Sequence, residues 1–578
     1  MKKLLVYLKS YKKETVLAPL FKMLEASFEL FVPLVIAAII DTGIENKDIT
    51  YIVKMALLLI VLAVIGLTCS LTAQYFSAKA AVGFAAKLKS ALFAHIESLS
   101  FKEIDTLGTS TLITRMTSDI NQVQSGVNLV LRLFLRSPFI VFGAMIMAFT
   151  IDMKAALIFV VAIPLLAIVV FGIMLISIPL FKKVQGALDN VLGITRQNLT
   201  GVRVIRAFNK EQSEIENFDD KNAVLTGLQK FVGKISALMN PVTFIIVNGA
   251  IAALIWVGAV RVDAGILTQG QVVALVNYMS QILVELVKLA NLIITVTKAV
   301  ACGNRIQSVF EIKPSMLEGD KHYECAEDEA SAVEFKNVNL CYNEGADNSL
   351  TGIDFSVKKG ETVGIIGGTG SGKSSLVGLI PRFYDATEGQ VLVDGVDVKE
   401  YGFDELREHV GIVMQKAVLF KGTIRENLKW GKNDATDEEL WNALDAAQAR
   451  EFVETKDGGL DFEIAQGGKN LSGGQKQRLT IARALVRKPD ILILDDSASA
   501  LDYATDAKLR AAVAALPGNM TVFIVSQRTA SIMHADKIIV LDDGQVVGMG
   551  TQEELLENCE VYKEIYNSQF KTTSAKEA

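Results

Sequence analysis

Cysteine is scarce in this chain of 578 residues, and an excess of positive charge is lacking. The five cysteines are scattered, without a C-x-x-C pair or the spacing of a metal site, and we interpret them as reduced structural thiols. They are Cys69, Cys302, Cys325, Cys341 and Cys559. The net charge is −6, whereas proteins that bind nucleic acid usually have a basic surface. We therefore expect no nucleic-acid partner.

Residues 1–14 contain lysines but no short apolar core that ends in a small-residue cleavage site. This pattern does not fit a removed signal peptide. It favours an amphipathic helix that lies along the inner membrane surface.

Apolar residues are abundant, at 51% of the chain, which is high for a soluble protein. They are concentrated in residues 16–300, whereas the last 250 or so residues have mixed charge and many glycines. A polar, acidic stretch with a proline separates the two regions. We therefore predict an α-helical membrane domain over residues 1–312, a linker over 313–330 and an α/β P-loop domain over 331–578.

Six segments are long and apolar enough to cross a bilayer core, which takes about 20 helical residues. They are Val16–Ile40, Met55–Tyr75, Leu129–Ile151, Ala155–Leu180, Pro241–Val262 and Val272–Val296. The two long connections, 76–127 and 182–240, are rich in helix formers and predict extensions beyond the lipid.

Lysine and arginine indicate the orientation of these spans, because they favour the cytoplasmic side. They are frequent in the N-terminal tail and in the two long connections, and sparse in the short connections. We therefore predict a multi-pass protein of the cytoplasmic membrane, with both termini and both long connections in the cytoplasm.

Several ionisable residues fall within the predicted spans, where charge is costly. They are Glu25, Glu29, Arg132, Arg136, Glu285 and Lys288. One interpretation is a substrate pathway or gate. The other is that the helices continue past the lipid, with Glu285 and Lys288 paired one turn apart. The sequence leaves both open.

The soluble region contains the pattern G-x-x-x-x-G-K-[ST] directly after an apolar strand. The residues are Gly367, Gly368, Thr369, Gly370, Ser371, Gly372, Lys373 and Ser374, followed by Ser375. Glycines in such a loop let backbone amides surround phosphates at a helix N-terminus. The lysine reaches the outer phosphates and the following hydroxyl binds Mg²⁺. The pattern predicts a site for ATP and Mg²⁺.

A second motif lies about 100 residues further along. It consists of Leu471, Ser472, Gly473, Gly474 and Gln475. A helix-like segment and then an apolar strand that ends in Asp495 follow it. Together these motifs resemble the signature and Walker B strand of ABC transporters, and the six spans extend the resemblance over the whole chain.

The resemblance implies roles for further residues. Tyr342 would stack on adenine, Gln415 would meet Mg²⁺ and sense the membrane domain, and Asp502 belongs to the loop through which paired nucleotide domains communicate. Together with Gln415, the residues implied to hold the metal are Ser374 and Asp495.

Two positions depart from the family pattern. Asp496 stands where the family has the glutamate that positions the attacking water, and its side chain is one methylene shorter. Displacing a positioning group by about 1 Å can cost around 100-fold in rate. Gln527 stands at the position of the switch histidine and cannot become a cation.

A weak water-positioning pair beside an intact signature implies pairing with a different half-transporter, because each ATP is held between two chains in this family. The chain thus resembles one half of a heterodimeric bacterial ABC exporter of the multidrug or lipid type, which carries hydrophobic small molecules or lipids. The alternatives are a homodimeric, slowly hydrolysing exporter or lipid flippase, and a nucleotide-gated channel or regulator. The cargo itself cannot be inferred from the sequence.

Overall fold

The computed structural model of this chain describes residues 1–322, 331–342, 347–497 and 499–570. They form two compact units, which we describe separately. One comprises Met1–Ser98 and Leu107–Lys313, and the other comprises Leu99–Thr106 and Pro314–Ala578. Part of the predicted linker, residues 323–330 with Cys325, lies outside the described residues.

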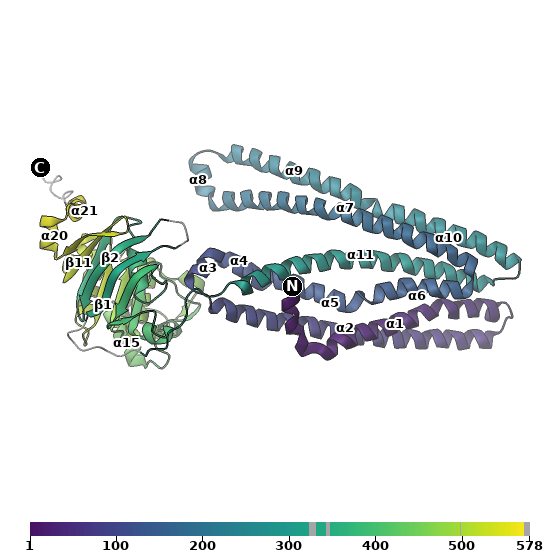
Figure 1. Cartoon of the computed structure of the whole chain (residues 1–578), viewed down its shortest axis with the longest axis horizontal. Helices are drawn as coiled ribbons and strands as arrows, with labels where there is room; N and C mark the ends of the chain where they lie inside the picture. The colour runs from purple at the N-terminus through teal and green to yellow at the C-terminus, as the bar shows by residue number, and fades with distance from the viewer. Residues whose placement is uncertain (323–330, 343–346, 498, 571–578) are drawn as a thin grey trace. The chain divides into compact units, whose positions relative to one another are not determined.

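The first unit is helical throughout (Figure 1). Its elements are η1 (Lys2–Tyr11), α1 (Lys12–Ala38), η2 (Ile39–Ile44), α2 (Ile49–Glu97), α4 (Thr109–Thr114), η3 (Arg115–Asp119), α5 (Ile120–Leu133), α6 (Arg136–Ile151), α7 (Met153–Thr200), α8 (Val202–Ala207), α9 (Glu211–Ala237), α10 (Met239–Asp263) and α11 (Gln269–Glu311). A further helix, α3 (Phe101–Leu107), begins in the second unit.

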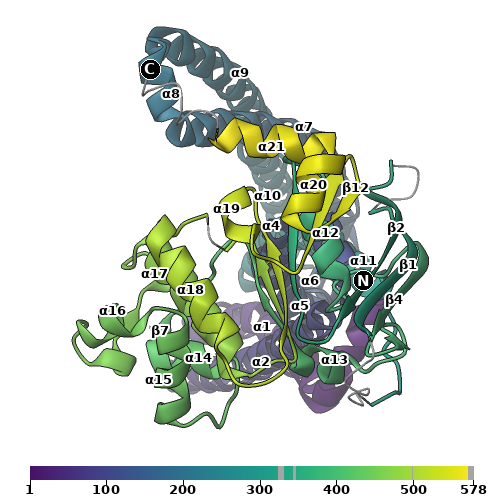
Figure 2. The same ribbon diagram turned by 90° about the vertical axis from the view of Figure 1, so that its left-hand side faces the viewer.

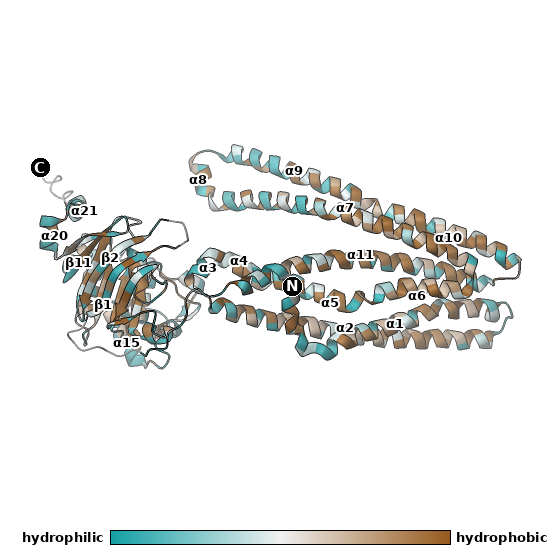
Figure 3. Ribbon diagram, viewed as in Figure 1, coloured by the Kyte–Doolittle hydropathy of each residue, from teal (hydrophilic) through white to brown (hydrophobic). Residues whose placement is uncertain are grey.

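Six helical segments are long and apolar enough to cross a membrane, which confirms the predicted helical membrane domain. The longest single helices, α2 and α7, have 49 and 48 residues. At 1.5 Å per residue each is about 70 Å long, more than twice the thickness of a hydrocarbon core. Figure 3 shows that the ends of α7 and α9 next to α8 are hydrophilic, whereas their other ends are apolar.

Small residues allow the membrane helices to pack closely. Ala144 and Ala148 of α6, Ala155 of α7 and Ala274 of α11 are fully buried in one apolar cluster. Larger side chains such as Phe159 and Tyr278 fill the remaining space. Close backbone approach at small residues is the usual basis of helix association in lipid, where the hydrophobic effect is weak.

The third predicted span, Leu129–Ile151, is interrupted. The helix α5 ends at Leu133 and α6 begins at Arg136, with a turn at residues 134–135. Pro138 explains the break, because it has no amide hydrogen for the carbonyl of Phe134 and its ring collides with that carbonyl. The predicted span therefore consists of two helices joined by a short turn.

The helix predicted at the N-terminus is η1, which is a 3-10 helix. Leu4 is buried against the rest of the unit, while Leu5 and Val6 are about half exposed. The amino group of Met1 donates to Oδ1 of Asn304 on α11 at 2.9 Å.

The second unit contains a six-stranded sheet with the order β12-β11-β3-β10-β9-β6 and an antiparallel sheet with the order β2-β1-β4-β5. The strands are β1 (Ser331–Leu340), β2 (Leu350–Lys358), β3 (Thr362–Gly367), β4 (Glu388–Val393), β5 (Val396–Asp397), β6 (Val410–Val413), β7 (Gly422–Thr423), β8 (Glu463–Ile464), β9 (Ile491–Asp495), β10 (Thr521–Val525), β11 (Lys537–Asp542) and β12 (Gln545–Gly550). The predicted α/β class is confirmed.

Helices surround these sheets. They are α12 (Lys373–Leu379), α13 (Phe403–His409), α14 (Ile424–Lys429), α15 (Asp437–Ala446), α16 (Arg450–Glu454), α17 (Gly473–Val486), α18 (Tyr503–Ala514), α19 (Thr529–Ile532), α20 (Gln552–Asn558) and α21 (Glu560–Phe570), and short 3-10 turns lie at 459–461 and 466–468. Figure 2 shows α14–α17 grouped on one side of the six-stranded sheet and β1, β2 and β4 on the other.

Candidate nucleotide site

The carboxyl ends of four parallel strands bring the predicted site residues together. In β9 and β10 Asp495 pairs with Val525, and in β3 and β10 Ile365 pairs with the same valine. The segments that follow β3, β6, β9 and β10 therefore leave the sheet at one edge, where α/β proteins usually bind ligands. These segments carry the P-loop, Gln415, Asp496 and Gln527.

The P-loop depends on glycine at two positions in particular. Gly372 has a φ of +91°, in the left-handed region, and a Cβ there would lie 2.8 Å from the carbonyl oxygen of Ser349. At Gly367 a Cβ would lie 2.1 Å from the carbonyl oxygen of Leu541. Larger residues would force the loop away from the strand, so the glycines fix its path ahead of α12.

Lys373 is 9% exposed and reaches back over its own loop. Its Nζ donates to the carbonyl oxygens of Gly367 at 3.0 Å and Gly368 at 2.6 Å, and to Oγ of Ser371 at 3.3 Å. Burial lowers the pKa of Lys373, although the nearby Asp496 and Asp495 oppose the shift. The ammonium is thus held by neutral groups, which a phosphate could replace.

Ser374 and Asp495 supply the two hard oxygen donors of the site. Oγ of Ser374 donates to Oδ1 of Asp495 at 3.0 Å. Burial raises the pKa of Asp495, the charge of Asp496 adds to the rise, and the serine and Lys373 oppose it. A hydroxyl and a carboxylate at this spacing fit Mg²⁺, which uses few protein ligands beside waters and phosphate oxygens. Among the described residues there is no cluster of three or more His, Cys, Asp or Glu side chains suited to a metal.

Asp496 is half-buried and is held by two contacts. Its backbone N–H donates to the carbonyl of Val525 at 3.0 Å, and its Oδ2 accepts from Nε2 of Gln415 at 3.1 Å. The register explains the second contact, because Val413 of β6 pairs with Leu494 of β9 and each residue lies two positions further on. Asp496 also has a φ of +46°, an uncommon conformation for a residue with a side chain.

Gln527 is exposed, and its backbone is fixed by the C-terminal helix α21. Nε2 of Gln569 donates to the carbonyl oxygen of Gln527 at 2.8 Å, and its Oε1 accepts from the N–H and hydroxyl of Thr529 at 2.9 and 2.8 Å. Gln569 could not be predicted as part of the site, because glutamine near the end of a polar helix is ordinary.

Arg528 connects this segment to the loop at residues 499–502. Its guanidinium donates to the carbonyls of Leu501 and Ser499, each at 3.3 Å, and lies 5.0 Å from the ring centre of Tyr503. Asp502 caps α18, since its carboxylate accepts from the N–H and hydroxyl of Thr505. The backbone contact lowers the pKa of Asp502. The role of Arg528 was not predicted.

A cleft of about 450 Å³ lies at this edge of the sheet. Its walls include Thr369, Gly370, Gly372, Lys373, Ser374, Ser375, Gln415, Asp495, Asp496 and Gln527. Gly367, Gly368 and Ser371 belong to the same loop without lining the cleft. Tyr342, Asp502 and the signature residues 471–475 do not line it either.

The signature segment opens the 14-residue helix α17 elsewhere in the unit. Ser472 is its N-cap: the serine Oγ accepts from the N–H of Gln475 at 3.3 Å, and the glutamine Oε1 accepts from the N–H of Ser472 at 3.0 Å. Leu471 is buried, whereas Ser472 and Gly473 are exposed. Gly474 fits closely against this unit, because a Cβ there would lie 3.1 Å from the carbonyl of Ala500. Exposed amides at the start of a helix suit an anion.

Tyr342 lies beside the P-loop helix. Its hydroxyl donates to Oγ of Ser375 at 2.8 Å, and its ring meets that of Tyr384 edge to face at 4.9 Å. The hydroxyl of Tyr384 in turn donates to Oδ2 of Asp105 on α3 at 2.7 Å. Burial, followed by this hydrogen bond, raises the pKa of Tyr384. A continuous set of contacts therefore joins α3 to the P-loop helix.

Comparison with known proteins identifies the family of the chain. The family profile of the ABC transporter transmembrane region matches residues 15–286, and that of the ABC transporter itself matches residues 350–499. A putative multidrug export ATP-binding/permease protein of Bacillus subtilis is 33% identical over 98% of this chain and 99% of its own length. An ATP-dependent lipid A-core flippase of Desulfotalea psychrophila is 34% identical over 80% of each chain.

The chain belongs to the ABC transporter family. It is a half-transporter of the exporter type, in which a multi-pass membrane domain is fused to an ATP-hydrolysing domain. The structure of a bacterial Atm1-family ABC exporter with ATP bound has the same fold, with a TM-score of 0.79 and 23% identity over 97% of this chain and 98% of that one.

Proposed function

We propose that this chain is one half of a heterodimeric exporter of the cytoplasmic membrane, with both termini in the cytoplasm. It contributes a degenerate nucleotide site, built on Lys373, Asp495, Asp496 and Gln527, and an intact signature for the other site. The observation that carries the proposal is the cleft itself, which holds the short Asp496 and the uncharged Gln527 but none of the signature residues.

In this proposal ATP occupies the cleft. The amides of residues 369–374 and the ammonium of Lys373 bind its phosphates, and Tyr342 stacks on the adenine after its ring turns from Tyr384. Ser374 and Asp495, with Gln415, hold Mg²⁺, which neutralises charge on the outer phosphates when bound. The carboxylate of Asp496 accepts a hydrogen bond from Gln415 at 3.1 Å, and its short side chain positions the attacking water poorly.

The second half of the transporter supplies what this chain lacks. Its own signature closes over this cleft, and its glutamate and histidine complete the site that receives Ser472 and the amides after it. Only that second site hydrolyses ATP quickly. Binding and hydrolysis of ATP then open the membrane cavity alternately to one side of the membrane and to the other.

We propose hydrophobic small molecules or lipids as the cargo. Two relatives support this class, one described as a putative multidrug exporter and the other as a lipid A-core flippase. The exposed Phe31 of α1 and Phe134 in the turn before α6 are compatible with it.

The decisive experiment measures ATP hydrolysis by the purified chain and by the complex recovered from native membranes through a tag on this chain. The chain alone should bind ATP and hydrolyse it slowly. Within the complex, Asp496→Glu combined with Gln527→His should raise hydrolysis at this site by up to about 100-fold, as expected for a carboxylate moved by about 1 Å. Asp496→Asn is the matched control and should not raise it. Rapid hydrolysis by the unaccompanied wild-type chain would contradict the proposal.

A further inference from the structure

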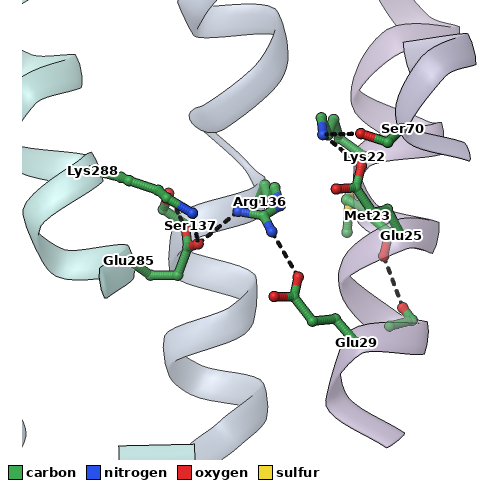
Figure 4. A network of polar contacts seen from close by, with 10 residues as sticks. Lys22, Met23, Glu25, Glu29, Ser70, Arg136, Ser137, Glu285 and Lys288 are labelled. Atoms are coloured by element: carbon green, nitrogen blue, oxygen red, sulfur yellow. Dashed lines mark hydrogen bonds and ion pairs between the residues drawn. The ribbon is translucent and has the colours of Figure 1, made fainter. Parts of the chain in front are cut away.

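Four charged side chains of alternating sign form a chain across three membrane helices (Figure 4). Glu29 of α1 accepts from Nη2 of Arg136 on α6 at 2.7 Å. Nη1 of the same arginine donates to Oε1 of Glu285 on α11 at 2.6 Å, and Nζ of Lys288 donates to that oxygen at 2.8 Å. We call these residues the charge chain.

The charge chain is buried in the middle and open at both ends. The side chains of Arg136 and Glu285 are 7% and 3% exposed, whereas those of Glu29 and Lys288 are 40% and 42% exposed. All four lie in segments apolar enough to span a membrane. Because charge at membrane depth avoids lipid, the two open ends face a water-filled cavity or another protein surface.

The open ends are also the dispensable members. Arg136 has two carboxylate partners, and Glu285 has Arg136, Lys288 and the hydroxyl of Ser137 at 2.8 Å. If either end turns toward a new partner, the buried pair keeps its mutual contact. Removing a buried partner would instead leave an uncompensated charge. Only Glu29 and Lys288 can therefore change partners without leaving a buried charge unpaired.

A neighbouring ion pair lacks this property. Lys22 and Glu25 of α1 are 2.5 Å apart with side chains 8% and 16% exposed, and Lys22 also donates to Ser70 of α2 at 3.1 Å (Figure 4). Both members of this pair are therefore largely buried, and neither offers an exposed charge to a ligand. In the charge chain, by contrast, Nε of Arg136 is buried without a hydrogen-bond partner among the described residues. Few buried polar groups in native structures lack a partner, and each one that does requires a specific explanation.

We propose that Glu29 and Lys288 form a headgroup subsite for a zwitterionic amphiphile, with the cation of the headgroup at Glu29 and its anion at Lys288. This inference rests on the proposed export function and names its substrate class. The charge chain is neutral as a whole, with two carboxylates and two cations. A ligand with a net charge would leave that charge uncompensated at membrane depth, whereas a headgroup with one charge of each sign keeps the assembly neutral.

The test uses three amphiphiles with the same ten-carbon tail: decylphosphocholine, decyltrimethylammonium and decyl phosphate, all below their micellar concentrations. The complex isolated through a tag on this chain is placed in lipid nanodiscs, and the concentration for half-maximal binding is measured for each probe. The wild type should prefer decylphosphocholine. Glu29→Gln should weaken the binding of the zwitterion and the cation by roughly two- to fivefold and leave the phosphate unchanged. Lys288→Gln should weaken that of the zwitterion and the phosphate and leave the cation unchanged.

The control variants distinguish a loss of the fold from a loss of the proposed subsite. Glu45→Gln and Lys298→Gln remove exposed charges outside the charge chain and should change nothing. Glu29→Asp and Lys288→Arg keep the charges and should retain the preference for the zwitterion. An unchanged order of preference in both glutamine variants, or an equal loss for all three probes, overturns the subsite. A complex that neither hydrolyses ATP nor moves any amphiphile would instead contradict the export function, whatever the three probes show in the binding assay.

Discussion

Lys373 and Arg136 are both buried cations, one at the edge of a parallel sheet and one among membrane helices, and their partners differ in kind. The partners of Lys373 are carbonyls and a hydroxyl, and no carboxylate lies within ion-pair distance of it in the described part of the chain. Arg136 lies between two carboxylates. A buried cation with neutral partners can bind an anion. A buried cation between carboxylates is already neutralised, so a new ligand can bind only to the exposed members of its ion-pair network.

Removing each cation tests this difference most directly. Arg136→Leu leaves Glu29 and the buried Glu285 without their shared partner, and we expect a loss of about 3–5 kcal/mol in the free energy of unfolding. Lys373→Leu removes hydrogen bonds to carbonyls and a hydroxyl without breaking an ion pair, and should lower stability far less. Thermal unfolding of the two purified variants in the same detergent checks this, and equal losses would show that the kind of partner does not matter.

For nucleotide binding, unlike stability, the loss of Lys373 should have the larger effect. Lys373→Ala should weaken binding of a fluorescent ATP analogue to the purified chain by about 10- to 100-fold, because a charged hydrogen bond to phosphate is lost. Lys508→Ala, which removes an exposed lysine from α18, is the matched control and should bind as the wild type does. Unaltered affinity after loss of Lys373 would exclude the P-loop as the phosphate site.

Proton competition sharpens the picture of the metal donors. The raised pKa of Asp495 means that this carboxyl takes up a proton at a higher pH than an ordinary aspartate. Below that pKa we expect Mg²⁺-dependent ATP affinity to fall by up to about tenfold per pH unit, and above it to be constant. Asp495→Asn should remove the dependence. Titration of Mg²⁺ at several pH values measures it, and a wild-type affinity that is flat with pH would show that Asp495 is not a ligand.

The smallest expected effect concerns the contacts between α3 and the P-loop helix. Tyr384→Phe removes the hydrogen bond to Asp105, which is worth about 1 kcal/mol, so substrate stimulation of ATP hydrolysis should fall about fivefold while ATP affinity stays the same. Tyr562→Phe is a matched control, because that buried hydroxyl has no hydrogen-bond partner in the described residues. Full stimulation in the Tyr384 variant would mean that α3 communicates by another route.

Motifs that begin at strand ends could be predicted well from the sequence. Lys373, Asp496 and Gln527 each follow a parallel strand and Asp495 ends one, so the topology alone brings them to one cleft. The signature segment opens a separate helix, as its glycine pattern indicates.

Contacts between distant segments could not be predicted. The pairing of Gln415 with Asp496 depends on the register of β6 and β9, and the clamp by Gln569 depends on where α21 docks. The link from Tyr342 to Asp105 needs two aromatic rings in one orientation. The break before α6 did have a signal, Pro138, which the apolar pattern outweighed because hydropathy carries no information about backbone donors.

The interruption at residues 134–135 has a mechanical consequence. Since Pro138 withholds one donor from the helix ladder, bending at this point strains fewer hydrogen bonds than bending elsewhere in the span. Arg136 stands on the first turn beyond it. The point at which this span bends therefore lies next to the buried Arg136. When the helix before the turn tilts, the guanidinium keeps its depth in the membrane.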